Sequence, residues 1–138
     1  MRTPKPLEAD VQKGLLEWLS WHHFQVVTKQ VGFAVAAQII STERVVGVVW
    51  RQNTGAMTGS HKGKGWHVAF GLPGLADIDG ILADGRRIGI EVKRPGGKLR
   101  PDQAAYGNMV QLMGGVWIVA DSVAALEAGL REAGVIER

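Results

Sequence analysis

Two acidic residues and one lysine are of types that can carry out metal-dependent chemistry where the fold brings them together. Thirteen residues separate Asp77 from Glu91, and Lys93 follows Glu91 after a single intervening residue. Side chains alternate between the two faces of a β-strand, so Glu91 and Lys93 project from the same face. Two carboxylates brought close together repel unless something positive lies between them, and a divalent cation with oxygen ligands meets that need.

The length of the turn between the two predicted strands decides whether the carboxylates meet. A two-residue loop, Asp84-Gly85, would leave Asp77 facing away from Glu91. A three-residue loop over residues 83–85 would set them directly opposite each other, with Cβ atoms about 4.5–5.5 Å apart. We favour the three-residue loop because it normally ends on a left-handed residue, a conformation that Gly85 adopts without steric strain.

Hydrophobic periodicity predicts the elements that surround this hairpin. Residues 33–40 fit either a helix or a strand, whereas further strands are predicted over residues 24–28, 45–50, 66–70 and 116–120. Helices are predicted over residues 7–21, from Pro101 to Gly114, and from Ser122 to Gly134. The apolar face of the second helix is predicted to consist of Tyr106, Met109, Val110 and Met113. This succession predicts an α/β or α+β fold with a mixed central β-sheet flanked by helices.

The composition limits the classes of protein. A chain of 138 residues is long enough for one sizeable core, and we interpret residues 1–138 as a single domain. The formal net charge of +3 permits nucleic-acid binding without establishing it, and the absence of cysteine excludes disulfides and thiolate metal sites. The apolar residues 31–50 are interrupted by Glu43 and Arg44, so they are too short and too charged to span a membrane. The N-terminus has no signal-peptide pattern.

The hairpin resembles the core motif of the PD-(D/E)XK nuclease superfamily, in which an acidic residue, a turn and a Glu-x-Lys sequence follow one another. Further segments are similar to the VRR-NUC branch, the virus-type replication–repair nucleases: residues 71–77, 91–99 and 101–103, the helix that carries Glu8, and residues 50–55. The resemblance covers most of the chain except residues 24–45. Ala76 stands where the superfamily name has proline, and no chemistry depends on that side chain.

The resemblance implies a restriction-endonuclease-like core and a nuclease that uses Mg²⁺ or Mn²⁺. Asp77 and Glu91 would hold one or two of these ions, with the backbone carbonyl of Val92 as a further ligand. Lys93 would orient the attacking water or stabilise the developing charge. Mg²⁺ keeps several waters and binds through only one or two carboxylates plus substrate phosphate. A site with so few side chains is therefore sufficient.

Two more residues enter the predicted catalytic set through the resemblance. Glu8 matches a helix-borne glutamate that reaches the metal site, although by position alone it is a carboxylate that favours the positive end of a helix. Gln103 matches a glutamine that borders the active site. Asp79 shares a face with Asp77, and we expect it to support the site without binding the metal.

Basic residues in glycine-bearing segments are predicted to contact DNA. Residues 55–65 are expected to form a flexible basic loop that follows a phosphate backbone, with a solvated hairpin tip as the alternative. Residues 94–100 are a second basic loop. The predicted DNA-binding residues are Arg51, Asn53, Lys62, Lys64, Arg94, Lys98 and Arg100.

The resemblance implies a metal-dependent DNA endonuclease, selective for branched, Holliday-junction-like DNA, in viral or phage replication, recombination or repair. We expect a homodimer, because two-fold symmetry supplies the two sites that a branched substrate needs, and residues 31–49 could contribute to its interface. We expect no membrane partner and a location in the cytoplasm of a bacterial or phage-infected cell. The alternative is a nucleic-acid-binding or assembly module that keeps the fold without cleaving. In that case Asp77 and Lys93 could belong to an ordinary cross-strand network.

Overall fold

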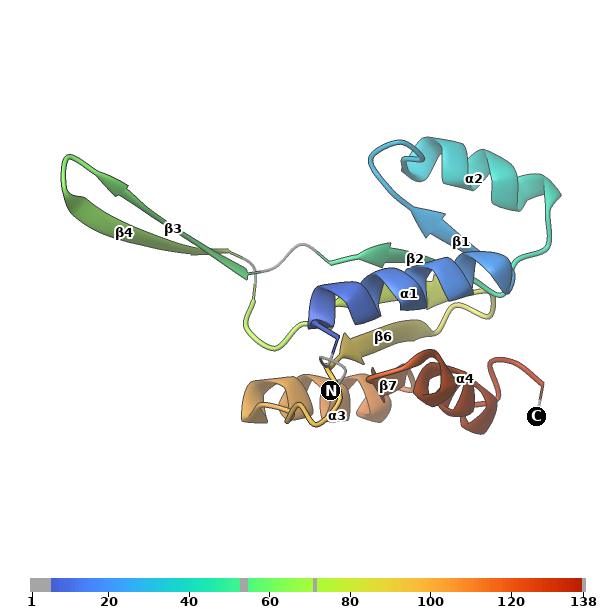
Figure 1. The fold of residues 1–138 in the computed structure, drawn as a ribbon. Coiled ribbons are helices and arrows are strands. Elements are labelled where there is room, and N and C mark those ends of the chain that lie inside the picture. The colour runs from blue at the N-terminus through green and yellow to red at the C-terminus, as the bar shows by residue number, and fades with distance from the viewer. Residues whose placement is uncertain (1–5, 53–54, 71, 138) are drawn as a thin grey trace, which may run out of the picture.

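The computed structural model describes residues 6–52, 55–70 and 72–137, with the backbone alone for residues 55–58 and 67–70. These residues form a five-stranded mixed sheet with helices on both faces, and a separate two-stranded hairpin (Figure 1). The helices are α1 (Glu8–Trp21), α2 (Phe33–Thr42), α3 (Pro101–Leu112) and α4 (Val123–Glu132). The strands are β1 (Phe24–Val27), β2 (Gly47–Arg51), β3 (Gly55–His61), β4 (Lys64–Phe70), β5 (Ile78–Leu82), β6 (Arg87–Val92) and β7 (Val116–Ala120). The predicted mixed sheet flanked by helices is confirmed.

The central sheet has the strand order β1-β2-β5-β6-β7. Strands β2, β5 and β6 run antiparallel in succession, while β1 and β7 lie parallel to β2 and β6 at the two edges. Strands β5 and β6, which carry the candidate carboxylates, are therefore inner strands. Residues 33–40, which fitted a helix or a strand, form most of α2.

The hydrophobic core lies between the sheet and the helices α1 and α4. Alternate residues of the inner strands, Ile78, Ile88 and Ile90, point to this side and are fully buried. They share one cluster with the inward side chains of both helices, which are Leu15, Leu19, Leu126 and Leu130. Helix α3 covers the opposite face of β6, so this strand is buried on both faces.

Helix α2 lies on the outside of the sheet and leaves much of its apolar surface open. Phe33, Val35 and Ile40 are 64%, 46% and 39% exposed, and Ala36 is the buried residue of the helix. The helix has ten residues, whereas a membrane span needs about 20. Throughout the described segments, no helix combines the length and the apolar character that crossing a membrane requires.

Helix α3 packs on the sheet with a different side from the one predicted. Met109 and Met113 are 54% and 84% exposed, so their placement in the apolar face is wrong. The buried residues of this helix are Gln103, Gly107 and Val110, which follow one another at helical spacing. The side of α3 that faces the sheet therefore carries an amide and a glycine together with one apolar side chain.

Gly107 explains this orientation. A Cβ built on this residue would lie 2.2 Å from Cδ2 of Trp117 in β7, which is far inside van der Waals contact. The helix backbone can therefore lie against the indole ring only where it has no side chain. Apolar periodicity carries no signal for such a contact, so the sequence pattern pointed to the wrong side of the helix.

Residues 55–65, predicted as a flexible loop, belong to a regular hairpin. Strands β3 and β4 pair antiparallel along their whole length and form their own two-stranded sheet. The turn residues Lys62 and Gly63 have φ angles of 52° and 76°, and a type I′ turn requires positive φ at both positions. The hairpin projects away from the central sheet (Figure 1) and its tip is exposed, whereas contact of this segment with a phosphate backbone stays a prediction.

We predict that Gly107→Ala lowers the free energy of unfolding by about 1–3 kcal/mol, because the added methyl group would overlap the Trp117 ring. Gly14→Ala is the matched control, since Gly14 also lies in a helix and no atom is within 4 Å of its Cβ position. Alanine favours a helix over glycine by roughly 1 kcal/mol, so the control should gain stability. Urea unfolding followed by circular dichroism measures both, and equal effects would contradict the packing of α3.

Candidate active site

The turn between β5 and β6 has the predicted three residues. The backbone N–H of Leu82 donates to the carbonyl of Arg86 over 2.8 Å, which closes the loop over residues 83–85. Gly85 has a φ of +91°, the left-handed conformation expected at the last loop position. The Asp84 carboxylate accepts hydrogen bonds from the backbone N–H (3.0 Å) and from Nε (2.8 Å) of Arg86, and these contacts stabilise the turn.

This turn brings the two candidate carboxylates to the same end of the sheet. Ile78 lies opposite Ile90, so the next pair towards this end consists of Asp77 and Glu91. Glu91 points to the α3 side of the sheet, where Gln103 contacts it, and the carboxyl group of Asp77 lies close enough to influence the pKa of Glu91. The register predicted from the three-residue loop is confirmed.

Glu91 is a buried carboxylate with one satisfied oxygen. The residue is 1% exposed, and its Oε1 accepts a 2.7 Å hydrogen bond from Nε2 of Gln103. Its Oε2 is buried and accepts no hydrogen bond from any donor in the described residues. Because a buried polar atom without a partner is unfavourable, this oxygen is available to a cation.

Gln103 connects Glu91 to Lys93. Its Oε1 accepts hydrogen bonds from Nζ of Lys93 (2.8 Å) and from the backbone N–H of Arg100 (2.9 Å). Lysine can only donate, so the amide oxygen must face Lys93, and the amide nitrogen is left for Glu91. Lys93 is 8% exposed, and its Nζ lies 3.9 Å from Oε1 of Glu91. The structure thus joins an acid, an amide and a base in one buried network.

Asp77 is half-buried and is held against β6. Its Oδ2 accepts a 2.8 Å hydrogen bond from the backbone N–H of Val92. In an extended strand the N–H and C=O of one residue point to the same side, so the Val92 carbonyl also lies on the Asp77 side of β6. Two carboxylates and one carbonyl therefore meet at this end of the sheet.

The pKa of Glu91 is raised to about 8, and burial is the largest cause. The Asp77 carboxyl group raises this pKa as well, because a protonated Glu91 can donate a hydrogen bond to it and because its negative charge opposes ionisation. The positive charge of Lys93 lowers the pKa of Glu91, and the negative charge of Glu8 raises it. Ionisation of Glu91 at neutral pH therefore calls for a further positive charge nearby.

The donors of this site suit a magnesium ion. Glu8 is exposed in the first turn of α1, and it is close enough for its negative charge to raise the pKa of Glu91. No three His, Asp or Glu side chains in the described part of the chain form a group that could hold a metal ion. The available donors are the carboxylates of Asp77 and Glu91 and the carbonyl of Val92. This set fits Mg²⁺, which completes its shell with water and substrate phosphate.

Asp79, one pair further along β5, belongs to a second polar cluster. It is fully buried, its Oδ1 accepts a 3.1 Å hydrogen bond from the Tyr106 hydroxyl, and its Oδ2 lies 3.2 Å from Nη2 of Arg87. Burial raises the pKa of Asp79, while the charge of Arg87 and the hydrogen bond from Tyr106 lower it. The cluster ties α3 to the inner strands and so positions the helix that carries Gln103.

Sequence reasoning missed the roles of Arg87 and Tyr106. Tyr106 was assigned to an apolar face, whereas its hydroxyl donates to Asp79. Arg87 pairs with Ile81, two residues from Asp79 on the same face. Diagonal cross-strand neighbours lie within reach of a long side chain, so the predicted register contained the signal for the pair of Arg87 and Asp79.

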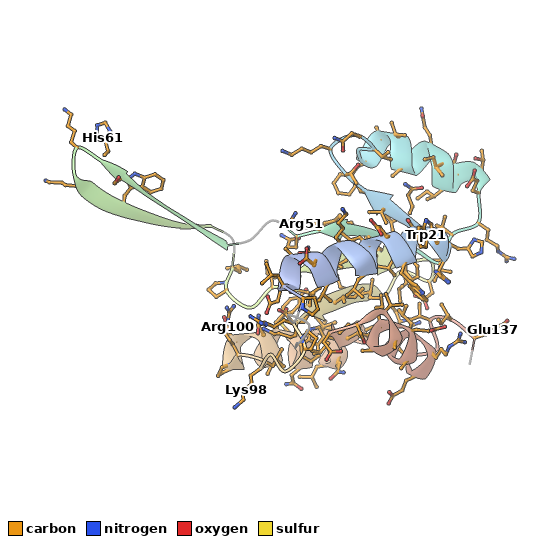
Figure 2. The ribbon with its side chains drawn as sticks, in the orientation of Figure 1. Trp21, Arg51, His61, Lys98, Arg100 and Glu137 are labelled. Atoms are coloured by element: carbon orange, nitrogen blue, oxygen red, sulfur yellow. The ribbon has the colours of Figure 1, made fainter. Side chains whose placement is uncertain are left out.

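One group of predicted DNA-binding residues lies beside the site. Arg94, Lys98 and Arg100 are exposed on the connection from β6 to α3, which begins directly after Lys93. Figure 2 shows Lys98 and Arg100 at the end of α3 where that helix begins. Nε of Arg100 also lies 3.3 Å from Oδ1 of Asp102 in an exposed ion pair.

The remaining predicted DNA-binding residues lie on other segments of the chain. Arg51 is exposed at the end of β2, opposite Ile78, so it lies at the same end of the sheet as Asp77. Asn53 lies outside the described residues. Lys62 and Lys64 are exposed at the hairpin tip, next to His61, which Figure 2 shows far from the central sheet. Lys62 and Lys64 therefore lie apart from the basic residues that follow Lys93.

The chain matches no protein-family model, and comparisons with curated proteins and with solved structures gave no significant match. The assignment of a function therefore depends on the geometry of the site and on the motif.

We predict that the protein without divalent metal loses stability as the pH rises from 4.5, the ordinary pKa of glutamate, to about 8. In this window the folded state keeps a proton on Glu91 that the unfolded chain releases, so the free energy of unfolding falls with rising pH. Glu91→Gln cannot titrate and should flatten the decline, whereas Glu17→Gln, at an exposed position of α1, should preserve it. Thermal unfolding in EDTA across this window is the measurement, and an unchanged decline in Glu91→Gln would contradict the raised pKa.

Proposed function

We propose that this chain is a divalent-metal-dependent endonuclease that hydrolyses phosphodiester bonds in DNA. The observation that carries the proposal is the buried Glu91 opposite Asp77, with one carboxylate oxygen unpartnered and with Lys93 held beside it by Gln103. The same residues form the motif that resembles the VRR-NUC branch of the PD-(D/E)XK superfamily. Geometry and motif thus support the same chemistry.

The side chains of the site have distinct parts in this reaction. A bound Mg²⁺ or Mn²⁺ supplies an activated water and offsets charge on the phosphate. Asp77 and Glu91 hold that ion by their carboxylates, with the Val92 carbonyl on the same side. Lys93 directs its ammonium group at the attacking water or at the charge that develops on the phosphate oxygens. Because Lys93 and Glu91 are buried, their charges act through a low dielectric and are poorly screened.

Gln103 is a positioning residue in this scheme. Its amide oxygen fixes Nζ of Lys93, and its amide nitrogen fixes Oε1 of Glu91, so acid and base keep a constant separation. Glu8 adds a negative charge near the site, which favours a cation there. Arg94, Lys98 and Arg100 suit the phosphates on either side of the cleaved bond, since they are exposed next to Lys93.

The resemblance also suggests a biological setting. We include in the proposal a preference for branched, Holliday-junction-like DNA and a part in viral or phage replication, recombination or repair. The corresponding location is the cytoplasm of a bacterial or phage-infected cell. The main support for these finer points is the motif, together with the basic residues that surround it.

We propose a homodimer in which the exposed apolar side of α2 contributes to the interface. Phe33 and Val35 are 64% and 46% exposed on this helix, and burial of such side chains favours association. Val35→Glu should therefore dissociate the dimer while leaving the fold intact, because this side chain has solvent access in the single chain. Sedimentation measures the change, and a monomer in the unmodified protein would contradict the dimer.

Cleavage of labelled DNA tests the proposal, with a four-way junction, a flap, a single strand and a plain duplex as substrates. We predict cutting that requires Mg²⁺ or Mn²⁺ and stops in EDTA. Asp77→Ala, Glu91→Ala and Lys93→Ala should each lower the rate by at least about 100-fold, because each removes a metal ligand or the charge beside it. Gln103→Ala should lower it by roughly tenfold, as expected of a residue that positions others.

Control variants separate these effects from a general change of charge. Asp10→Ala, Lys13→Ala and Glu17→Ala alter exposed residues of α1 and should retain the rate of the unmodified protein. Cutting that survives Asp77→Ala and Glu91→Ala would place the reaction at another site or in a contaminant. DNA binding without cutting of any substrate would favour the alternative, a nucleic-acid-binding or assembly module with the same fold.

A further inference from the structure

The β3–β4 hairpin stands apart from the rest of the fold (Figure 1). Its two strands of seven residues each pair with one another in a sheet of their own. Seven residues at about 3.3 Å each give an arm roughly 20 Å long. An isolated two-stranded hairpin is only marginally stable in water. Contact with another molecule would therefore stabilise an arm of this length.

The arm tip, residues 60–66, is exposed and basic. His61, Lys62 and Lys64 lie there, and Figure 2 shows His61 at the end farthest from the central sheet. No acidic residue occurs between Glu43 and Asp77 in the sequence, so no carboxylate of the arm offsets this charge. The charge favours a polyanion as the partner.

The shape of the arm tip suits the groove of a nucleic-acid duplex. The Trp66 ring lies across Gly59 of the paired strand, so close that a Cβ on Gly59 would lie 2.3 Å from Cζ2 of the indole. This contact stiffens the ribbon, yet Trp66 remains 42% exposed for contact with a partner. The major groove of B-form DNA is about 12 Å wide and admits a two-stranded β-ribbon.

We propose that the β3–β4 hairpin is a DNA-docking arm whose tip enters the major groove of a duplex segment beside the cleaved bond. The inference rests on the proposed nuclease function and deepens it by naming a substrate class. That class is DNA with a B-form duplex of roughly 20 Å, about six base pairs at 3.4 Å each, next to the cleavage site. Lys62 and Lys64 would contact phosphates at the edges of the groove.

A second copy of the chain is the other occupant that such an arm could have. The charge disfavours it, because two arms of the same positive sign repel each other. Sedimentation of the arm variants therefore measures their oligomeric state alongside their DNA binding.

The first experiment removes charge from the arm tip. The double variant Lys62→Ala/Lys64→Ala is compared with Lys13→Ala/Lys29→Ala. This control makes the same change of charge at exposed positions outside the hairpin, in α1 and between β1 and α2. Binding to a plain DNA duplex is measured in EDTA, so that no cleavage occurs. The arm variant should bind on the order of tenfold more weakly, and its slope of log affinity against log salt should decrease by about 1.8, or about 0.9 for each lost phosphate contact. The control should leave the slope unchanged.

The second experiment shortens the arm and keeps its charge. Deletion of Gly59, Ser60, Gly65 and Trp66 removes two facing pairs, while the alternation of faces, the turn and both lysines remain. The tip then lies about 7 Å closer to the body, which corresponds to about two base pairs. The hydroxyl-radical footprint on the duplex should become about two base pairs shorter at the end that the arm protects. Trp66→Ala in a full-length arm should keep the length of the footprint.

The outcomes distinguish the arm from the nuclease. An unchanged footprint in the shortened variant, with an unchanged salt slope in the charge variant, overturns the arm even where metal-dependent cutting persists. Arm variants that dissociate a dimer while each subunit keeps its duplex affinity also overturn it, because a second copy is then the occupant. Arm-dependent duplex binding without any cutting supports the arm and removes the nuclease.

Discussion

The buried carboxylate of Glu91 is the constraint around which the inner strands and α3 are arranged. Helices α1 and α4 cover one face of its strand and α3 covers the other, so water cannot freely solvate Glu91 when it ionises. Gln103 provides one hydrogen bond and Lys93 a partial countercharge, and the second oxygen is left without a donor. A buried acidic group persists only where its surroundings hold it in place. The hydrogen bond and the ion pair of Asp79 do so by fixing α3 to the inner strands.

The hairpin that carries the site could be predicted from the sequence because its information is local. The alternation along the strand fixes which side chains share a face, and Gly85 indicates a loop that ends on a left-handed residue. Those two facts determine the register and set Asp77 opposite Glu91. The α+β class followed in the same way, from the order of segments that each show one clear periodicity.

The parts that the sequence did not reveal depend on contacts between distant segments or on unusual backbone angles. Trp117 decides which side of α3 faces the sheet, and it lies in the strand that follows that helix. Lys62 adopts a positive φ without being glycine or asparagine, so the turn of the β3–β4 hairpin carries no usual signature. Gln103 could be linked to Lys93 only through the resemblance, because a helical glutamine alone indicates no function.

One oxygen atom serves both the beginning of α3 and the candidate lysine. Oε1 of Gln103 accepts the backbone N–H of Arg100, where the helix begins, and also Nζ of Lys93. Fraying of the first helical turn would withdraw this acceptor, and it would release the ammonium group and uncover Glu91 in a single step. Local opening of one turn requires far less free energy than unfolding of a domain. The site therefore stays ordered only while the first turn of α3 remains formed, because that turn holds both Lys93 and Glu91 in place.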